Sequence, residues 1–246
     1  MNIKKKYFFA FSLLLTLQGC TFTPTNDDIS KIPVTWSTGF TLPKLLISPV
    51  SLHSINDIPN LITANWYDYF SVKNRNNEKF DIYSCQDYFS HKNITPVNAF
   101  DINPFLNIIM MCEAAKYLLD AKPSQQSYLP ISILDKYLPL YLPKELALQT
   151  STNAHKRTIE NINLTFWQDI LPIINFEYIS DSKAIYHFDN GYQEVEIVGR
   201  GDINHDNIED LIIIVRDSLN DGSYFNLRLF ILSVNKNNEW HIIEYV

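Results

Sequence analysis

One stretch of this sequence has the residue types and the spacing to bind a metal ion. Between residues 202 and 210, oxygen-bearing side chains occupy alternate positions at the start of a short polar segment. The ligand candidates are Asp202, Asn204, Asp206 and Asp210, with the backbone carbonyl of Ile208. Calcium takes roughly six to eight hard oxygen ligands, and carboxylates this close together repel one another unless a cation lies between them. The spacing therefore predicts a calcium site formed by these five residues.

This spacing resembles the Asp-x-Asp/Asn-x-Asp-Gly-x-x-Asp calcium loop of FG-GAP and VCBS repeats, integrin-type propellers and dockerins, over residues 200–214. The resemblance implies a weak, structural calcium ion that joins the two strands of a hairpin. Asn207 stands in place of the family's Gly, and Asn tolerates a left-handed backbone. Ile213 stands in place of the final Glu of an EF-hand, so an EF-hand sensor is excluded. The alternative is an empty turn, because Asp and Asn favour turns in any case.

The first twenty residues have the pattern of an export signal. Lys4 to Lys6 precede the apolar run Tyr7–Leu17, which is too short to cross a bilayer as a helix. The run ends in Leu17-Gln18-Gly19-Cys20, which resembles the lipobox of bacterial lipoproteins. The resemblance implies cleavage before Cys20, lipid on its sulfur and amine, and sorting to the outer membrane, since Thr21 rather than Asp follows. The alternative is an ordinary signal peptide with Cys20 as a free thiol.

The charge balance excludes one class of partner. Twenty Lys and Arg stand against 27 Asp and Glu, a net charge of −7, and removal of residues 1–19 leaves 17 basic residues. So acidic a chain is not expected to bind nucleic acid. It is not expected to be attracted to anionic lipid either, so its acyl chains would have to hold it on the membrane. Residues 20–32 are polar and without periodicity, which predicts a lipidated tether.

The other two cysteines remain as a pair once Cys20 is assigned to lipid. Asn103 and Pro104 are typical of a helix start, and the helix that follows carries Cys112 on its apolar stripe. Cys85 precedes an aromatic stretch that can pack against that helix. In an exported protein this predicts a Cys85–Cys112 disulfide, with two buried free thiols as the alternative.

The elements that must position these groups change character near residue 172. Before it, the patterns predict a mainly helical region over residues 33–171, with helices at 60–72, 86–90, 104–121, 131–137, 145–149 and 155–170. After it, alternating apolar residues predict strands at 176–180, 184–188, 193–199, 210–216, 224–234 and 240–245. Short turns make neighbouring strands antiparallel. We therefore expect an α+β fold, in which the helical region packs on one face of an antiparallel β-meander over residues 172–246.

No catalytic motif accompanies this framework. The sequence lacks the His-Glu-x-x-His, Gly-x-Ser-x-Gly and phosphate-loop patterns, and its six histidines do not cluster. Ser180 and Lys183 match Ser-x-x-Lys, but in an expected turn rather than on a helix. His187 and His241 are interpreted as sheet residues and His205 as a solvent-facing loop residue. The aromatic run Trp66–Phe70 has the spacing of core residues, although it could also line a groove.

These patterns favour a non-enzymatic envelope lipoprotein, anchored through Cys20 and stabilised by calcium, which binds an envelope protein or glycan. The alternative is a cell-wall or polysaccharide hydrolase whose carboxylates meet only in the fold. Two carboxyl groups about 5–10 Å apart in a cleft, one with a raised pKa, would favour the hydrolase. An exposed apolar patch would favour the binding protein.

Overall fold

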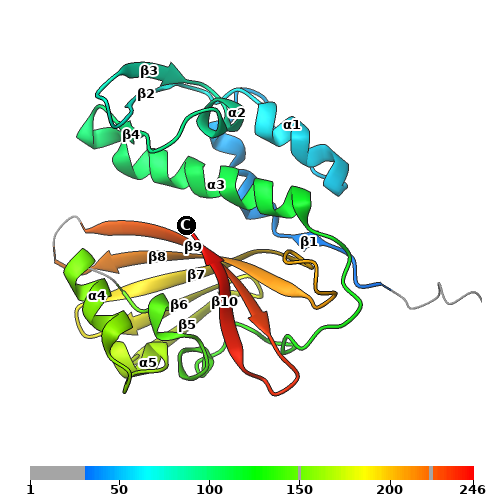
Figure 1. The fold of residues 1–246 in the computed structure, drawn as a ribbon, viewed down its shortest axis with the longest axis vertical. Coiled ribbons are helices and arrows are strands. Elements are labelled where there is room, and N and C mark those ends of the chain that lie inside the picture. Colours follow the sequence, from blue (N-terminus) through cyan, green and yellow to red (C-terminus); the bar gives the residue numbers. More distant parts are fainter. Residues whose placement is uncertain (1–30, 149–150, 222–223) are drawn as a thin grey trace, which may run out of the picture.

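The computed structural model describes residues 31–148, 151–221 and 224–246 (Figure 1). A large antiparallel sheet forms the C-terminal part of the chain, and a helical layer with a small sheet forms the N-terminal part. The fold is therefore α+β, with the helical part preceding the sheet, as the sequence predicts. Cys20, the export signal and all but the last two residues of the expected tether lie outside the described residues.

The large sheet is a meander in which each strand pairs with its neighbours in the chain. Its strands are β5 (Asn175–Ser180), β6 (Lys183–Phe188), β7 (Gly191–Gly201), β8 (Asp210–Leu219), β9 (Phe225–Val234) and β10 (Trp240–Tyr245). They lie in the order β10-β9-β8-β7-β6-β5, and every pair is antiparallel. The short strand β1 (Thr35–Trp36) pairs with β7 at Gly199 and Arg200, beyond the end of β6. The six predicted strands and their order are confirmed.

Both faces of this sheet are covered. On one face, Val198, Ile212 and Leu229 belong to the core that includes α3 (Ile102–Asp120). On the other face, Val195, Ile213 and Phe230 belong to a second core, completed by residues from 129–147 and by α5 (Trp167–Ile170). The expectation that helices pack on one face alone was wrong. The runs in β8 and β9 are almost continuously apolar, which is typical of strands buried on both sides.

The helical region also contains a second sheet. Its helices are α1 (Ile58–Thr63), α2 (Cys85–Phe89), α3, α4 (Thr152–Glu160) and α5, with 3₁₀ turns at Thr38–Thr41, Pro43–Leu45, Ile55–Asp57, Ala99–Asp101, Leu138–Leu140 and Lys144–Leu146. The helix expected over residues 60–72 ends at Thr63. Residues Phe70–Lys73 instead form β2, which pairs with β3 (Lys79–Ile82) and β4 (Thr95–Pro96). Among the described residues, no helix is both long and apolar enough to cross a bilayer.

The helices expected over residues 86–90 and 104–121 are present as α2 and α3, whereas polar side chains and prolines shorten or remove those expected after residue 130. The helix expected over residues 155–170 is divided into α4 and α5. Lys144 Nζ donates to the carbonyls of Ile159 and Asn161, at 3.0 and 2.8 Å, and so caps the end of α4. Over residues 131–137 there is no helix, and of the helix expected over 145–149, the described residues 145–148 keep only the 3₁₀ turn that ends at Leu146. Pro139 and Pro143 restrict the backbone here.

A buried polar network joins the second core to the sheet. The Arg228 guanidinium donates to both carboxylate oxygens of Asp217, at 3.0 Å each. It also donates to the carbonyls of Glu145 and Leu146, at 2.7 and 3.0 Å. Gln193 donates to Asp217 and to the same Leu146 carbonyl. All three side chains are buried, so strands β7, β8 and β9 together hold the 3₁₀ turn Lys144–Leu146 against the sheet.

Replacing Arg228 by Met should destabilise the fold strongly. Asp217 would remain buried without its bidentate partner, which costs about 3–5 kcal/mol of the free energy of unfolding. Urea denaturation measures this loss. The double variant Arg228→Met with Asp217→Leu removes both charges and should recover much of the stability. Equal stability of wild type and Arg228→Met would contradict the role given to this network.

Candidate functional site

The acidic loop predicted from the sequence connects β7 to β8. Its ends are paired neighbours, because Gly201 lies opposite Asp210 in the antiparallel ladder. The loop also rests on the segment that follows α3. Lys122 and Asp202 exchange backbone hydrogen bonds of 2.9 Å, and Glu209 N–H donates to the Gln126 carbonyl at 2.8 Å. The sheet and the helical layer therefore both hold this loop.

Two of the predicted ligands close the loop from opposite ends. The Asp202 carboxylate accepts the backbone N–H groups of Asp206 and Asn207, at 2.9 and 3.0 Å. The Asp210 carboxylate accepts those of Ile203 and Asn204, at 2.9 and 3.3 Å. Asp202 and Asp210 are buried, whereas Asn204 and Asp206 lie exposed at the rim. The structure thus brings the predicted residues into one loop, with two carboxylates inside it.

The remaining loop residues set the shape of the turn. Asn207 has φ 70°, the left-handed conformation for which Asn can replace Gly, and His205 has φ 65°. The His205 ring is exposed, and its Nε2 lies 3.0 Å from the carbonyl of Asp120 at the end of α3. Ile208 N–H donates to Asp206 Oδ1 at 2.8 Å.

Asp210 is the most unusual group in the loop. Its Oδ1 is buried and has no hydrogen-bond partner among the described residues. Burial raises the pKa of this carboxyl, although the Ser233 hydroxyl and the N–H groups of Ile203 and Asn204 oppose the shift. A buried carboxylate oxygen without a donor fits the chemistry of a hard cation. Among the described residues, however, no three His, Cys, Asp or Glu side chains converge closely enough to hold a metal ion.

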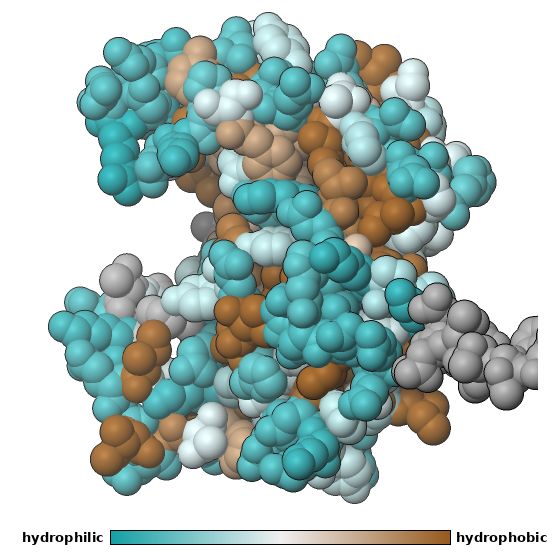
Figure 2. All heavy atoms as spheres, turned by 45° about the vertical axis from the view of Figure 1, so that its right-hand side comes forward, coloured by the Kyte–Doolittle hydropathy of each residue, from teal (hydrophilic) through white to brown (hydrophobic). Residues whose placement is uncertain are grey.

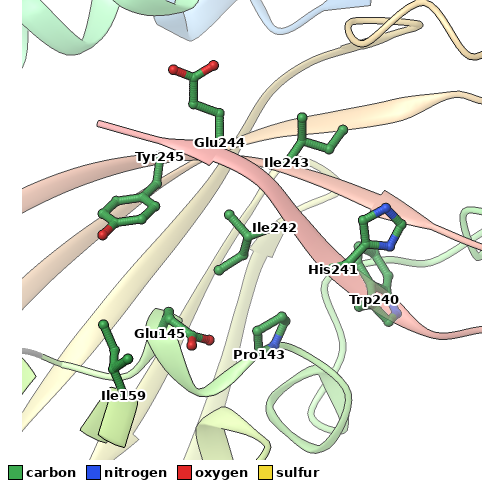
Figure 3. Close-up of a pocket in the computed structure, with 9 residues that line it drawn as sticks. All are labelled: Pro143, Glu145, Ile159, Trp240, His241, Ile242, Ile243, Glu244 and Tyr245. Atoms are coloured by element: carbon green, nitrogen blue, oxygen red, sulfur yellow. The ribbon is translucent and has the colours of Figure 1, made fainter. Parts of the chain in front are cut away.

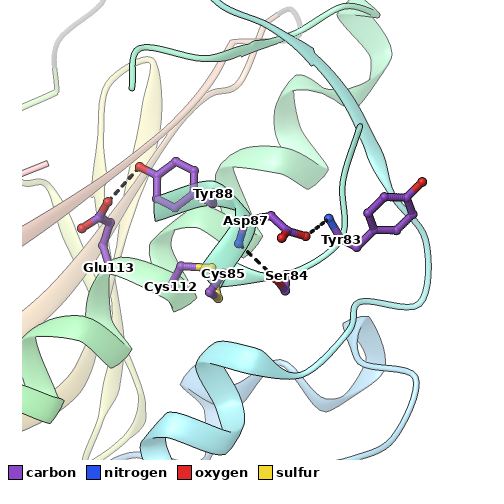
Figure 4. The surroundings of a disulfide bond; sticks show 7 residues. All are labelled: Tyr83, Ser84, Cys85, Asp87, Tyr88, Cys112 and Glu113. Carbon is purple, nitrogen blue, oxygen red and sulfur yellow. Dashed lines mark hydrogen bonds between the residues drawn. A yellow bond between two sulfur atoms is a disulfide. The ribbon is translucent and has the colours of Figure 1, made fainter. Parts of the chain in front are cut away.

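The predicted disulfide is present. Cys85 and Cys112 are bonded, with their Cα atoms 5.3 Å apart, and both are buried (Figure 4). Cys85 begins α2, where the Ser84 hydroxyl accepts the Asp87 N–H. A second link lies beside the bond, because the Tyr88 hydroxyl donates to Glu113 Oε1 at 2.8 Å. Together they fix the short helix α2 to the middle of α3.

A groove along β10 was missed by the sequence analysis. A cavity of about 640 Å³ lies between this strand and the elements beneath it (Figure 3). It is lined by Pro143, Glu145, Ile159 and all residues from Trp240 to Tyr245. Tyr245 and Ile159 are 52% and 43% exposed, and His241 is exposed rather than held inside the sheet. The sequence indicates only that the last strand of a meander has a neighbour on one side, which does not by itself define a groove.

Other apolar surface lies over the helical layer. Figure 2 shows hydrophobic side chains gathered there, whereas the surface around the sheet below is largely hydrophilic. The aromatic run Trp66–Phe70 divides between core and surface. Trp66 and Phe70 pack edge to face, with ring centroids 5.7 Å apart, whereas Tyr67 and Tyr69 are exposed.

Two carboxylates on β7 bear on the hydrolase alternative. Glu194 and Glu196 share one face of the strand, and Lys183 Nζ lies 2.8 Å from the first and 3.9 Å from the second. Burial raises the pKa of Glu196, against the opposing charges of Lys183 and Arg216. Glu196 opens onto a cavity of only about 40 Å³. Ligand pockets usually hold about 300 Å³ or more, so this pair does not by itself favour catalysis.

Comparison with known proteins identifies no relative of this chain. No family model, curated protein or solved structure matches the chain. The function must therefore be argued from the chemistry of the loop, the disulfide and the groove.

Removing the disulfide should lower the stability of the helical layer. In the chain-entropy model, opening a loop of this length costs about 3–4 kcal/mol. We expect the double variant Cys85→Ala, Cys112→Ala to show a loss of this size in urea denaturation, and wild type to show the same loss in reductant. Mass spectrometry of the exported protein should find both thiols resistant to alkylation until reduced. Two thiols that react without reductant would contradict the bond.

Proposed function

We propose that this chain is a lipid-anchored protein of the bacterial cell envelope, which binds an envelope protein or glycan and catalyses no reaction. The groove beside β10 is the observation that carries the binding role. It combines a cavity of about 640 Å³ with exposed apolar side chains, of which Tyr245 is the largest. Ligand and partner sites commonly have these properties.

The proposed anchor rests on the sequence. The basic segment, the apolar run and Leu17-Gln18-Gly19-Cys20 follow one another in the order of a lipoprotein signal. Lipid on the sulfur and the amine of Cys20 would supply several acyl chains, and more than one chain is needed for stable anchoring. Thr21 in place of Asp supports the outer membrane as the destination.

The proposed calcium ion would stabilise the loop between β7 and β8. Asp202, Asn204, Asp206 and Asp210 would supply side-chain oxygens, and Ile208 its carbonyl. Support comes from the unpartnered, buried Oδ1 of Asp210 and from the nearby negative charge of Asp206, which raises the pKa of the Asp210 carboxyl further. A cation there would relieve their repulsion and strengthen the connection between the two strands.

Calcium should raise the melting temperature of the protein. With a dissociation constant on the order of 10⁻⁴ M, 10 mM calcium would add about 2.7 kcal/mol, or roughly 5–10 °C, relative to EDTA. Differential scanning calorimetry measures this shift. Asp210→Asn should abolish it, and Asp189→Asn, in the turn between β6 and β7, should preserve it.

The same experiment has a pH dependence with a definite sign. Calcium requires the ionised carboxyl, and burial raises the pKa of Asp210 in the folded chain. The calcium-dependent shift should therefore be complete above that pKa and disappear as the pH falls through it. Absence of any shift at neutral pH and millimolar calcium would refute the calcium site.

Replacing Cys20 by Ser should release the protein from the membrane. We expect the full chain, expressed in a Gram-negative host, to incorporate radiolabelled palmitate and to sediment with outer membranes. Cys20→Ser should lose both properties, because the serine hydroxyl does not replace the thiol in lipidation. The Cys85→Ala, Cys112→Ala variant is the matched control and should keep the label. A label that survives Cys20→Ser would contradict the anchor.

A further inference from the structure

Two adjoining hollows lie where the first two 3₁₀ turns meet α3 and the large sheet. The outer hollow has a volume of about 360 Å³, and its walls are mainly the leucines and the proline of residues 42–45 together with Pro104 of α3. The inner hollow is the cavity of about 40 Å³ beside Glu196. Three residues line both hollows, namely Gly39, Leu42 and Asn107. Neither hollow shares a lining residue with the groove along β10.

The Glu196 carboxylate lacks a hydrogen bond at this junction. Lys183 Nζ lies 3.9 Å from its Oε2, which is beyond hydrogen-bond distance, and 2.8 Å from Glu194 instead. Among the described residues, no group donates a hydrogen bond to Glu196. Burial raises the pKa of this carboxyl, and only the charges of Lys183 and Arg216 oppose the shift. Glu196 is therefore an acceptor without a donor at the edge of the inner hollow.

The other polar side chains of the lining already have partners. Arg216 Nη2 donates to Asn107 Oδ1 at 3.0 Å, and Arg216 Nε lies 3.4 Å from Glu194 Oε1. The second end of the Asn107 amide donates to the Asn103 carbonyl at 2.8 Å. These interactions hold Asn107 and Arg216 in place, so Glu196 is the acceptor that a ligand would meet.

The turn that separates the two hollows brings the backbone close to this carboxylate. A Cβ at residue 39 would lie 2.8 Å from Glu196 Oε1, closer than a non-bonded contact allows, so Gly39 leaves the junction open. Leu42 has φ 40°, a left-handed conformation that is strained for a residue with a branched side chain. Backbone strain of this kind is often found where a segment is shaped around a ligand.

The charges and the volumes of the lining define the class of ligand. Lys44 lines the outer hollow and Arg216 the inner one, so both would repel a cationic group, whereas the Glu196 carboxylate would repel an anionic one. The outer volume lies within the range of small-molecule pockets. The inner hollow has room for about one polar group, since a water molecule occupies about 30 Å³.

We propose that the two hollows bind a small, uncharged, apolar molecule that carries one N–H or O–H donor. Its apolar body occupies the outer hollow, and its donor enters the inner hollow and forms a hydrogen bond with Glu196. This site goes beyond the binding role proposed for the groove along β10, and each of the two can be tested without the other.

Methionine methyl NMR detects a ligand at the site itself. The chain has three Met, of which Met110 and Met111 line the inner hollow. The lipidated full chain, isotope-labelled at the methionine methyl groups and kept in detergent, is titrated with indole and with N-methylindole, which lacks the N–H donor. Indole should shift both methyl signals. Because detergent takes up the two probes to different extents, the quantity compared between variants is the ratio of their dissociation constants.

Glu196→Met removes the acceptor and keeps the size of the side chain. The preference for indole over N-methylindole should be about tenfold smaller in this variant than in wild type, because a hydrogen bond to a charged acceptor is lost. The melting temperature should not fall, since Met replaces a largely buried carboxylate that has no hydrogen bond. The matched control is Glu177→Gln on β5, which should keep the wild-type preference.

Gly39→Ala keeps the carboxylate and narrows the junction between the hollows. Gly39 does not have a left-handed backbone, and the added Cβ meets the end of the flexible Glu196 side chain, so the fold should tolerate the change. We expect indole to bind this variant about tenfold more weakly than wild type.

Three results would overturn the proposal. In wild type, indole would leave the signals of Met110 and Met111 unshifted up to its solubility limit. Glu196→Met would keep the wild-type preference for indole, or Gly39→Ala would bind indole as tightly as wild type does. Failure of the binding role of the β10 groove would appear instead as no capture of envelope protein or glycan, with the response to indole unchanged.

Discussion

The buried pair of Arg228 and Asp217 is the constraint on which most of this architecture depends. A guanidinium and a carboxylate are costly to remove from water, and here every guanidinium nitrogen donates a hydrogen bond and both carboxylate oxygens accept one. The pair itself bridges β8 and β9. Through the carbonyls of Glu145 and Leu146 it also holds an irregular, proline-containing segment against the sheet. That segment has few hydrogen bonds of regular secondary structure, so the hydrogen bonds from the Arg228 guanidinium fix its position.

The two layers use different means of attachment. Beneath the sheet, a polar network selects one position for the chain. Above it, α3 packs on the sheet through apolar side chains, and a disulfide then fixes α2 to α3. The loop between β7 and β8 contacts both parts, through its own strands and through the segment after α3. A change of charge in this loop would therefore alter contacts with the sheet and with the helical layer at the same time.

The meander could be predicted from the sequence because strands that pair in it also follow one another in the chain. Period-two alternation and short polar turns define six strands. The turns are too short for the crossover that parallel strands need, so neighbouring strands must be antiparallel. The small sheet was not readable, because Trp66, Tyr69 and Phe70 also match helical spacing, and only pairing with Lys79–Ile82 and Thr95–Pro96 selects a strand. The disulfide followed from the number and placement of the cysteines. The groove did not follow, since it depends on how far Ile159 and Pro143 lie from β10, which no local pattern encodes.

The described chain begins close to the acidic loop. Ile32 exchanges backbone hydrogen bonds with Ser124, and two residues earlier Lys122 pairs with Asp202. In Figure 1 the chain enters at this end of the sheet, while α4 lies at the other end. In an anchored protein the body would be suspended from the loop end. The Tyr245 end of the groove would then point away from the bilayer and would be accessible to a partner that is not in the same membrane.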